Sequence, residues 1–268
     1  MATTVEVLSE AFDEMGTPFI VGHPGGETVE LMDAARNRQV RFILMKQETA
    51  GAMMAATWGE ITGSPGVSVS TRGPGAANMV NGVAHAWMDR APLIVINDQY
   101  PGATYETGMR QVLNQHALFA PITKWQSTIH AKSVRQQIRR AIRVTTTPTP
   151  GPVQFDMPSN ETMGEAVEAA GEAPLLPNVV PMEPDRNALR VPLQALSNAS
   201  RPILLAGLGV FWDAASTELV KLAERLGAPV LTTSKSKGAI PEDHPLRAGC
   251  IIGGLIEREL VTQADMIV

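Results

Sequence analysis

Glu48 is the residue of this sequence whose type and position most strongly suggest chemistry. It opens a predicted helix in which residues 49–56 are nearly all small or apolar, so the carboxylate stands alone among them. Two glycines flank a proline in Gly73-Pro74-Gly75, directly after a predicted strand over residues 67–71. The backbone can turn sharply there, with no side chain in the way of a close neighbour. Together, the carboxylate and this bare turn indicate a site for one flat, polar ligand.

Three other motifs are weaker candidates for a site. His85 and Asp89 are four residues apart and can share a helix face, but two ligands do not make a metal site, so we expect them to pair with each other or to be solvated. Gly207-Leu208-Gly209 follows a predicted strand, although the third glycine of a dinucleotide-binding fingerprint is missing. His116 lies close to Gln111 in the sequence and could reach the same site. We predict no metal ligands within this chain.

The elements that must position Glu48 and the glycine turn follow a regular rhythm. Predicted strands begin roughly every 25 residues, with a helix between each pair, at 18–21, 40–44, 67–71 and 92–96. Such crossovers produce a parallel sheet with helices on both faces, and ligands bind at the carboxyl ends of its strands. The turns after the first three strands carry His23-Pro24-Gly25, Glu48 and Gly73-Pro74-Gly75. We therefore expect all three features at one edge of an α/β sheet.

The composition divides the chain into two α/β parts. We predict an N-terminal domain over residues 1–165, a linker over 166–185 that is rich in Glu, Ala and Pro, and a Rossmann-like domain over 186–268. Residues 264–268 have the pattern of a buried strand that is just beginning. We therefore expect the second domain to be incomplete and the chain to be part of a longer protein.

Composition and charge exclude several classes of function. Hydrophobic residues make up 44% and charged residues 18% of the sequence, which is close to an average globular protein. The net charge is −5 with no cluster of Lys and Arg, so we expect no nucleic acid partner. Cys250 is the only cysteine, which excludes an internal disulfide and fits a reducing compartment. No signal peptide or membrane span is predicted, so we expect a cytoplasmic protein with no membrane partner.

Six motifs occur in an order and spacing that resemble a known enzyme family. They are Gly22-His23-Pro24-Gly25-Gly26, Glu48 with Ala52-Met53-Met54-Ala55, Gly73-Pro74-Gly75-Ala76-Ala77-Asn78, the segment 86–92, Pro121-Ile122-Thr123-Lys124 and Pro150-Gly151-Pro152-Val153. The series is similar to the N-terminal half of the acetolactate-synthase-like family of thiamine-diphosphate enzymes. Residues 201–268 resemble the central domain of that family. The resemblance implies a thiamine-diphosphate-binding fold for the first domain.

The resemblance also implies a role for each candidate residue. In the family, the carboxylate at the position of Glu48 hydrogen-bonds N1′ of the cofactor's aminopyrimidine and favours an imino tautomer, which removes the proton from the thiazolium C2. The resulting carbanion attacks a 2-oxo acid. The turns Pro24-Gly25 and Gly73-Pro74-Gly75 resemble the family's loops that approach the pyrimidine. Gln111 is similar to a family glutamine that faces the reacting group. We therefore predict Glu48 and Gln111 as catalytic residues, and as cofactor-binding residues Pro24, Gly25, Glu48, Gly73, Pro74, Gly75 and Asn78.

The sequence departs from the family in three places. The usual Phe-Gln-Glu is replaced by Arg110-Gln111-Val112, so the acid after the glutamine is missing and the substrate stays open. Flavin-binding members carry Arg-Pro-Gly-Pro where this chain has Thr149-Pro150-Gly151-Pro152, which weakens the case for FAD but leaves it open. The Gly-Asp-Gly motif that holds Mg²⁺ and the diphosphate in family members does not occur in these residues. The resemblance thus implies that Mg²⁺ binds through a C-terminal domain outside them.

We predict an enzyme that acts on 2-oxo acids by decarboxylation and carboligation and is most similar to acetolactate synthase. Because the family's cofactor lies between subunits, the resemblance implies a homodimer or homotetramer with the Glu48 helix at the interface. Two alternatives stay open: a decarboxylase or lyase with another 2-oxo acid substrate, and a non-catalytic α/β ligand-binding or regulatory protein that kept the fold. We expect the 268 residues by themselves to be inactive.

Overall fold

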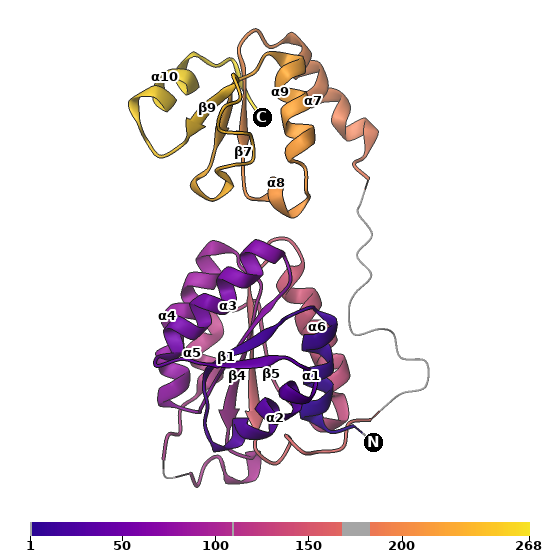
Figure 1. Ribbon diagram of the computed structural model, residues 1–268, viewed down its shortest axis with the longest axis vertical. Coiled ribbons are helices and arrows are strands. Elements are labelled where there is room, and N and C mark those ends of the chain that lie inside the picture. The colour runs from indigo at the N-terminus through magenta and orange to yellow at the C-terminus, as the bar shows by residue number, and fades with distance from the viewer. Residues whose placement is uncertain (1, 109, 168–182) are drawn as a thin grey trace. The chain divides into compact units, whose positions relative to one another are not determined.

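The chain forms two compact units, Met1–Val179 and Val180–Val268. The computed structural model describes residues 2–108, 110–167 and 183–268. Each unit is an α/β structure built around a parallel sheet (Figure 1), which confirms the predicted fold class. Residues 168–182 of the linker predicted over 166–185 lie outside the described residues.

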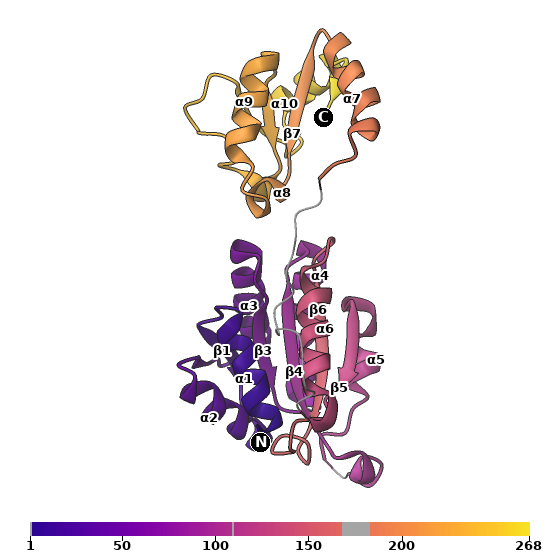
Figure 2. The same ribbon diagram turned by 90° about the vertical axis from the view of Figure 1, so that its right-hand side faces the viewer.

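Helices and strands alternate through the first unit. They are α1 (Thr4–Glu14), β1 (Phe19–His23), α2 (Val29–Asn37), β2 (Arg41–Leu44), α3 (Glu48–Thr62), β3 (Gly66–Ser70), α4 (Pro74–Asp89), β4 (Leu93–Gln99), α5 (Gln115–Phe119), β5 (Trp125–Thr128), α6 (Val134–Thr146) and β6 (Pro152–Pro158). The strands are all parallel, in the order β2-β1-β3-β4-β6-β5. Figure 2 shows β1, β3, β4 and β6 in succession across this sheet.

Alternate strand residues of the first unit face opposite layers of helices. Ile20 and Ile94 pack in one cluster with residues of α1, α2 and α6, whereas Val21 and Val95 pack in a second cluster with residues of α3, α4 and α5. Figure 1 shows α3 and α4 on one side of the sheet and α1 and α6 on the other. Burial on both faces explains why the central strands are apolar at consecutive positions.

The ends of two helices follow from local chemistry. At the start of α1, the backbone N–H of Thr3 donates to Glu6 Oε2 at 2.7 Å, and the N–H of Glu6 donates to Thr3 Oγ1 at 3.4 Å. This capping box satisfies two free donors of the helix and lowers the pKa of Glu6 through the backbone hydrogen bond. Helix α3 ends at Gly63, whose φ of 73° is left-handed and favours glycine.

The second unit contains a smaller parallel sheet in the order β10-β7-β8-β9. Its elements are α7 (Arg186–Asn198), β7 (Pro202–Ala206), α8 (Gly209–Trp212), α9 (Ser216–Leu226), β8 (Val230–Thr232), β9 (Arg247–Cys250), α10 (Leu255–Gln263) and β10 (Met266–Ile267). Leu204 and Val230 form its core with Ala223 of α9. The pattern at 264–268 predicted a strand, and β10 pairs there with β7. Among the described residues of both units, no helix has the length and apolar character needed to cross a membrane.

Candidate functional site

The segments that carry the predicted site follow three neighbouring strands of the first sheet. β1 lies between β2 and β3, with Gly22 opposite Leu44 and His23 opposite Ser70. The carboxyl ends of these strands therefore meet at one edge, as the sequence predicted. From β1 the chain goes to β2 on one side and then to β3 on the other. Such a change of direction opens a crevice at the carboxyl ends, where α/β proteins bind ligands.

Glu48 is the first residue of α3, and its side chain is buried, with 7% of the residue exposed. A carboxylate is favoured there by the positive end of the helix dipole. Asn78, from the first turns of α4, donates from Nδ2 to Glu48 Oε2 at 3.2 Å. On the other side, a Cβ added to Gly75 would lie 3.3 Å from Glu48 Oε1. One carboxylate oxygen is thus held by an amide, and the other lies beside bare backbone.

The two glycine turns pack against neighbours that leave no room for a side chain. A Cβ added to Gly25 would lie 2.6 Å from Thr71 Oγ1, which brings the turn after β1 against the turn after β3. Gly73 has a φ of 60°, and a Cβ added there would lie 2.2 Å from the carbonyl oxygen of Gln111. These glycines are therefore required by close approach and, at Gly73, also by a left-handed backbone.

A buried glutamine that the sequence analysis did not single out holds the turn after β3. The backbone N–H of Gly73 donates to Gln115 Oε1 at 2.9 Å. The Nε2 group of Gln115 donates to the carbonyl of Asp98 at 3.2 Å and to Asp156 Oδ1 at 2.7 Å. The turn is thereby tied to the carboxyl ends of β4 and β6, and its position is set by a fully hydrogen-bonded side chain.

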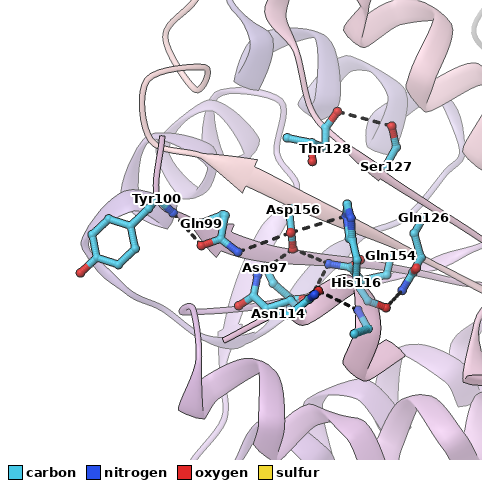
Figure 3. A network of polar contacts seen from close by, with 12 residues as sticks. Asn97, Gln99, Tyr100, Asn114, His116, Gln126, Ser127, Thr128, Gln154 and Asp156 are labelled. Atoms are coloured by element: carbon cyan, nitrogen blue, oxygen red, sulfur yellow. Dashed lines mark hydrogen bonds and ion pairs between the residues drawn. The ribbon is translucent and has the colours of Figure 1, made fainter. Parts of the chain in front are cut away.

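Asp156 is the centre of a buried polar network that the sequence analysis also missed (Figure 3). Its Oδ1 accepts from Gln154 Nε2 at 2.7 Å, and its Oδ2 accepts from Gln99 Nε2 at 3.4 Å. Gln154 also donates to Asn97 Oδ1 at 3.0 Å. The available signal was the presence of polar residues in strands that are otherwise apolar, because a polar group is buried only when it is hydrogen-bonded.

An ion pair precedes the second turn. Arg72 Nε lies 2.7 Å from Asp98 Oδ2, and both side chains are almost completely buried. The Arg72 guanidinium also lies 4.0 Å from the ring centroid of Tyr100. This pair anchors the residue before Gly73 to the end of β4. The sequence signal that could have indicated this ion pair was a charged residue, Arg72, directly before the glycine turn.

Two residues predicted for the site, Gln111 and His116, lie beside Gly73 and Asp156. The carbonyl group of Gln111 lies against Gly73, and the φ of Gln111, 57°, is unusual for a residue with a side chain. The role of its exposed side chain stays a prediction. His116 faces Asp156, with Nε2 3.5 Å from Oδ2. His85 and Asp89 form the expected pair on α4, at 3.2 Å.

One cavity of the first unit lies away from this edge. It has a volume of about 580 Å³, lies between α2 and the amino end of β2, and shares no residue with the predicted site. Within the part of the chain that the structure describes, no group of three or more His, Cys, Asp or Glu side chains could hold a metal ion.

Comparison with known proteins identifies sequence families over most of the chain. Residues 2–118 match the family described as thiamine pyrophosphate enzyme, N-terminal TPP binding domain. Residues 190–268 match the family described as thiamine pyrophosphate enzyme, central domain.

Individual relatives agree with these matches. A probable acetolactate synthase large subunit of Methanocaldococcus jannaschii is 34% identical over 98% of this chain and 46% of its own length. A probable 2-ketoarginine decarboxylase of Pseudomonas aeruginosa is 31% identical over 99% of this chain and 48% of its own length. The chain thus spans about half the length of the curated relatives it matches.

A solved structure agrees in fold as well. The thiamine diphosphate-dependent 4-hydroxybenzoylformate decarboxylase of Rhodococcus jostii superposes with a TM-score of 0.86 and 26% identity, over 99% of this chain and 51% of that chain. The sequence matches and this superposition cover both units. The chain therefore belongs to the thiamine pyrophosphate enzymes and carries their N-terminal and central domains.

Proposed function

We propose that this chain forms the pyrimidine-binding half of a thiamine-diphosphate-dependent enzyme that acts on 2-oxo acids. The observation that carries the proposal is the buried carboxylate of Glu48 at the start of α3. It has one oxygen bonded to Asn78 and the other beside Gly75. A flat heteroaromatic ring with a polar edge fits this arrangement, because the carboxylate can pair with a ring nitrogen.

Each residue of this chain has a separate task in the proposal. Glu48 holds a proton against N1′ of the aminopyrimidine, and Asn78 fixes which carboxylate oxygen makes that contact. Pro24-Gly25 and Gly73-Pro74-Gly75 bring backbone close to the ring. Burial keeps water away from the shared proton, which is a condition for efficient proton transfer. Thiamine diphosphate, when bound, supplies the electron sink for cleavage next to the 2-oxo group.

The names of the relatives support the substrate class. Two of them are named as decarboxylases of 2-oxo acids, 2-ketoarginine and 4-hydroxybenzoylformate, and another is named as a probable acetolactate synthase subunit. We therefore propose decarboxylation or carboligation of a 2-oxo acid. The acid itself is not assigned, because Val112 stands where the family has a glutamate.

The proposal places the remainder of the cofactor outside these residues. Mg²⁺ and the diphosphate would be held by a part of the enzyme that corresponds to the other half of the relatives, supplied by a second subunit of a homodimer or homotetramer. Exposed apolar side chains on α3 and α4, Ile61 and Met88, support an interface on that face. Thr149 in place of the flavin-associated arginine supports an enzyme without FAD.

The test is cofactor-dependent turnover of 2-oxo acids by the enzyme that contains this chain. Release of CO₂ from a panel of 2-oxo acids is measured with and without thiamine diphosphate and Mg²⁺. We expect cofactor-dependent release that falls at least about 100-fold in Glu48→Gln. The control Glu60→Gln changes a carboxylate of the same helix and should keep the wild-type rate. No release from any acid would favour the non-catalytic ligand-binding alternative.

A further inference from the structure

A second cavity lies at the same edge of the first sheet, beyond the ends of β4, β5 and β6. Its volume is about 280 Å³, and the residues that line it include Gln99, Tyr100, Tyr105, Gln115, His116 and Asp156. Among the described residues of this lining there are one carboxylate and two tyrosines, and neither lysine nor arginine. The cavity is too small for a drug-sized molecule but large enough for a compact polar group.

The two oxygens of Asp156 are unequally satisfied. Oδ1 accepts from the amides of Gln115 and Gln154, both at 2.7 Å. Among the described residues, Oδ2 has only longer contacts, at 3.4 Å to Gln99 Nε2 and at 3.5 Å to His116 Nε2. Figure 3 shows Gln99 and His116 on either side of this carboxylate. Because an ionised carboxylate has about four acceptor positions, Oδ2 retains capacity for a donor from a ligand.

His116 does not satisfy that oxygen. Its Nε2 atom is buried and makes no hydrogen bond to any of the described residues, although it lies 3.5 Å from Asp156 Oδ2. The backbone carbonyl of His116 is held by Gln126 Nε2 at 2.8 Å, which fixes this part of the chain. The cavity therefore offers a fixed carboxylate whose outer oxygen lacks a short hydrogen bond.

Aromatic rings add a second feature of cation recognition. Tyr100 and Tyr105 both line the cavity, and tyrosine faces attract cations through their electron-rich rings. The ring of Tyr100 already carries the guanidinium of Arg72 at 4.0 Å. The charge of that arginine is balanced by Asp98 at 2.7 Å, so it does not cancel the negative potential of Asp156.

We propose that this cavity binds a planar organic cation, a guanidinium or amidinium group, through Asp156 Oδ2 and a tyrosine ring. A planar group can donate a hydrogen bond in its own plane and stack by its face, whereas a compact ammonium has no face to stack. The negative charge of Asp156 and the two tyrosines of the lining thus favour the same chemical class. The group belongs either to the side chain of a 2-oxo acid or to a separate small molecule.

The side chain of Gln115 connects the cavity to the proposed pyrimidine site. Gln115 accepts from Gly73 N–H at one end of its amide and donates to Asp156 Oδ1 at the other. A guanidinium at Asp156 could therefore be the remote end of a substrate, and in that case the inference rests on the proposed function. Binding of the cation does not require thiamine diphosphate. A negative result for cation binding therefore leaves the proposed enzymatic function untouched, and the reverse also holds.

The test compares ligands that differ only in the planar cation. Arginine and citrulline, which carry a guanidinium and a neutral urea, are titrated into the 268-residue chain without cofactor, and binding is followed by NMR. We expect arginine to bind at least about tenfold more tightly, with shifts of the His116 and Tyr105 ring signals. Equal binding of the two, or no binding of arginine, would overturn the proposal.

Variants test the roles of Asp156 and Tyr105, and further ligands identify the source of the planar cation. Asp156→Asn should weaken arginine binding at least about tenfold, whereas Asp33→Asn, an exposed carboxylate on α2, should not. If Asp156→Asn does not fold, Tyr105→Leu decides: a loss of about threefold or more supports the assignment, and unchanged affinity refutes it. Tighter binding of a guanidino 2-oxo acid than of agmatine identifies a substrate side chain, and equal binding identifies a separate small molecule.

Discussion

At the scale of single residues, Glu48 and Asp156 are two buried carboxylates with different surroundings. Glu48 accepts one hydrogen bond, from the side-chain amide of Asn78, and has Gly75 beside its other oxygen. Asp156 accepts hydrogen bonds from the side-chain amides of three glutamines. The Glu48 carboxylate thus has one amide donor among the described residues, whereas three amides fix the Asp156 carboxylate in the frame of the sheet. Their neighbours therefore assign them different tasks, although Glu48 follows the end of β2 and Asp156 lies near the carboxyl end of β6.

Neighbouring glycines provide a matched test of the close packing at this site. Gly25→Ala should lower the free energy of unfolding by about 1–3 kcal/mol, because the added Cβ is forced against a neighbouring side chain. That Cβ would lie 2.6 Å from Thr71 Oγ1, whereas one added to Gly26 would meet no atom within 4 Å. Gly26→Ala should therefore change stability by less than about 0.5 kcal/mol. Chemical denaturation of both variants checks this, and equal losses would contradict the described packing.

At the scale of elements, α5 connects the two halves of the sheet edge through its first residue. Gln115 joins the turn after β3 to the ends of β4 and β6. Those strands come together only because β6 lies between β4 and β5. The position of the turn at Gly73 therefore depends on an arrangement formed by distant parts of the chain.

Replacing Gln115 tests this connection. Gln115→Met keeps the size of the side chain but removes its three hydrogen bonds and leaves buried partners unsatisfied, so we expect the free energy of unfolding to fall by about 3 kcal/mol. Within the described part of the chain, the side chain of Gln126 makes one hydrogen bond, to the carbonyl of His116, and Gln126→Met should cost about 1 kcal/mol. Urea denaturation measures both values. Similar losses in the two variants would show that Gln115 is not the anchor of the turn.

The dependence of the site on the order of the strands also explains which of its parts could be predicted from the sequence. Glu48 and the glycine turns could be predicted as candidates because each follows a predicted strand at a recognisable spacing. The network around Asp156 was missed because it requires the order β4-β6-β5, which the chain does not follow in sequence. β5 was missed as well, because Trp125–Thr128 is a half-buried edge strand with polar residues and lacks the apolar run of the central strands.

At the scale of the whole molecule, α3 and α4 are packed closely together and present apolar side chains outward. A Cβ added to Gly82 of α4 would lie 2.6 Å from Ala52 Cβ of α3. Ile61 on α3 and Met88 on α4 are 77% and 73% exposed in the single chain. Large exposed apolar residues on adjoining helices are typical of a surface that another protein covers. We propose that a second copy of this chain covers them.

Self-association can be measured directly. Sedimentation velocity of the chain should show a dimer or tetramer, and Met88→Lys should shift it towards the monomer by placing a charge in an apolar interface. Val29→Lys, at an exposed position on α2, should leave the assembly unchanged. A monomeric wild-type chain, or an assembly that tolerates Met88→Lys, would contradict the proposed interface.

Activation of the cofactor by Glu48 can be measured as hydrogen–deuterium exchange at C2 of thiamine diphosphate in the loaded enzyme. We expect Glu48→Gln to slow this exchange by about 100-fold or more. Glu60→Gln, about 18 Å further along α3, should exchange at the wild-type rate. Equal exchange in wild type and Glu48→Gln, at the rate of the free cofactor, would refute the proposed role of Glu48.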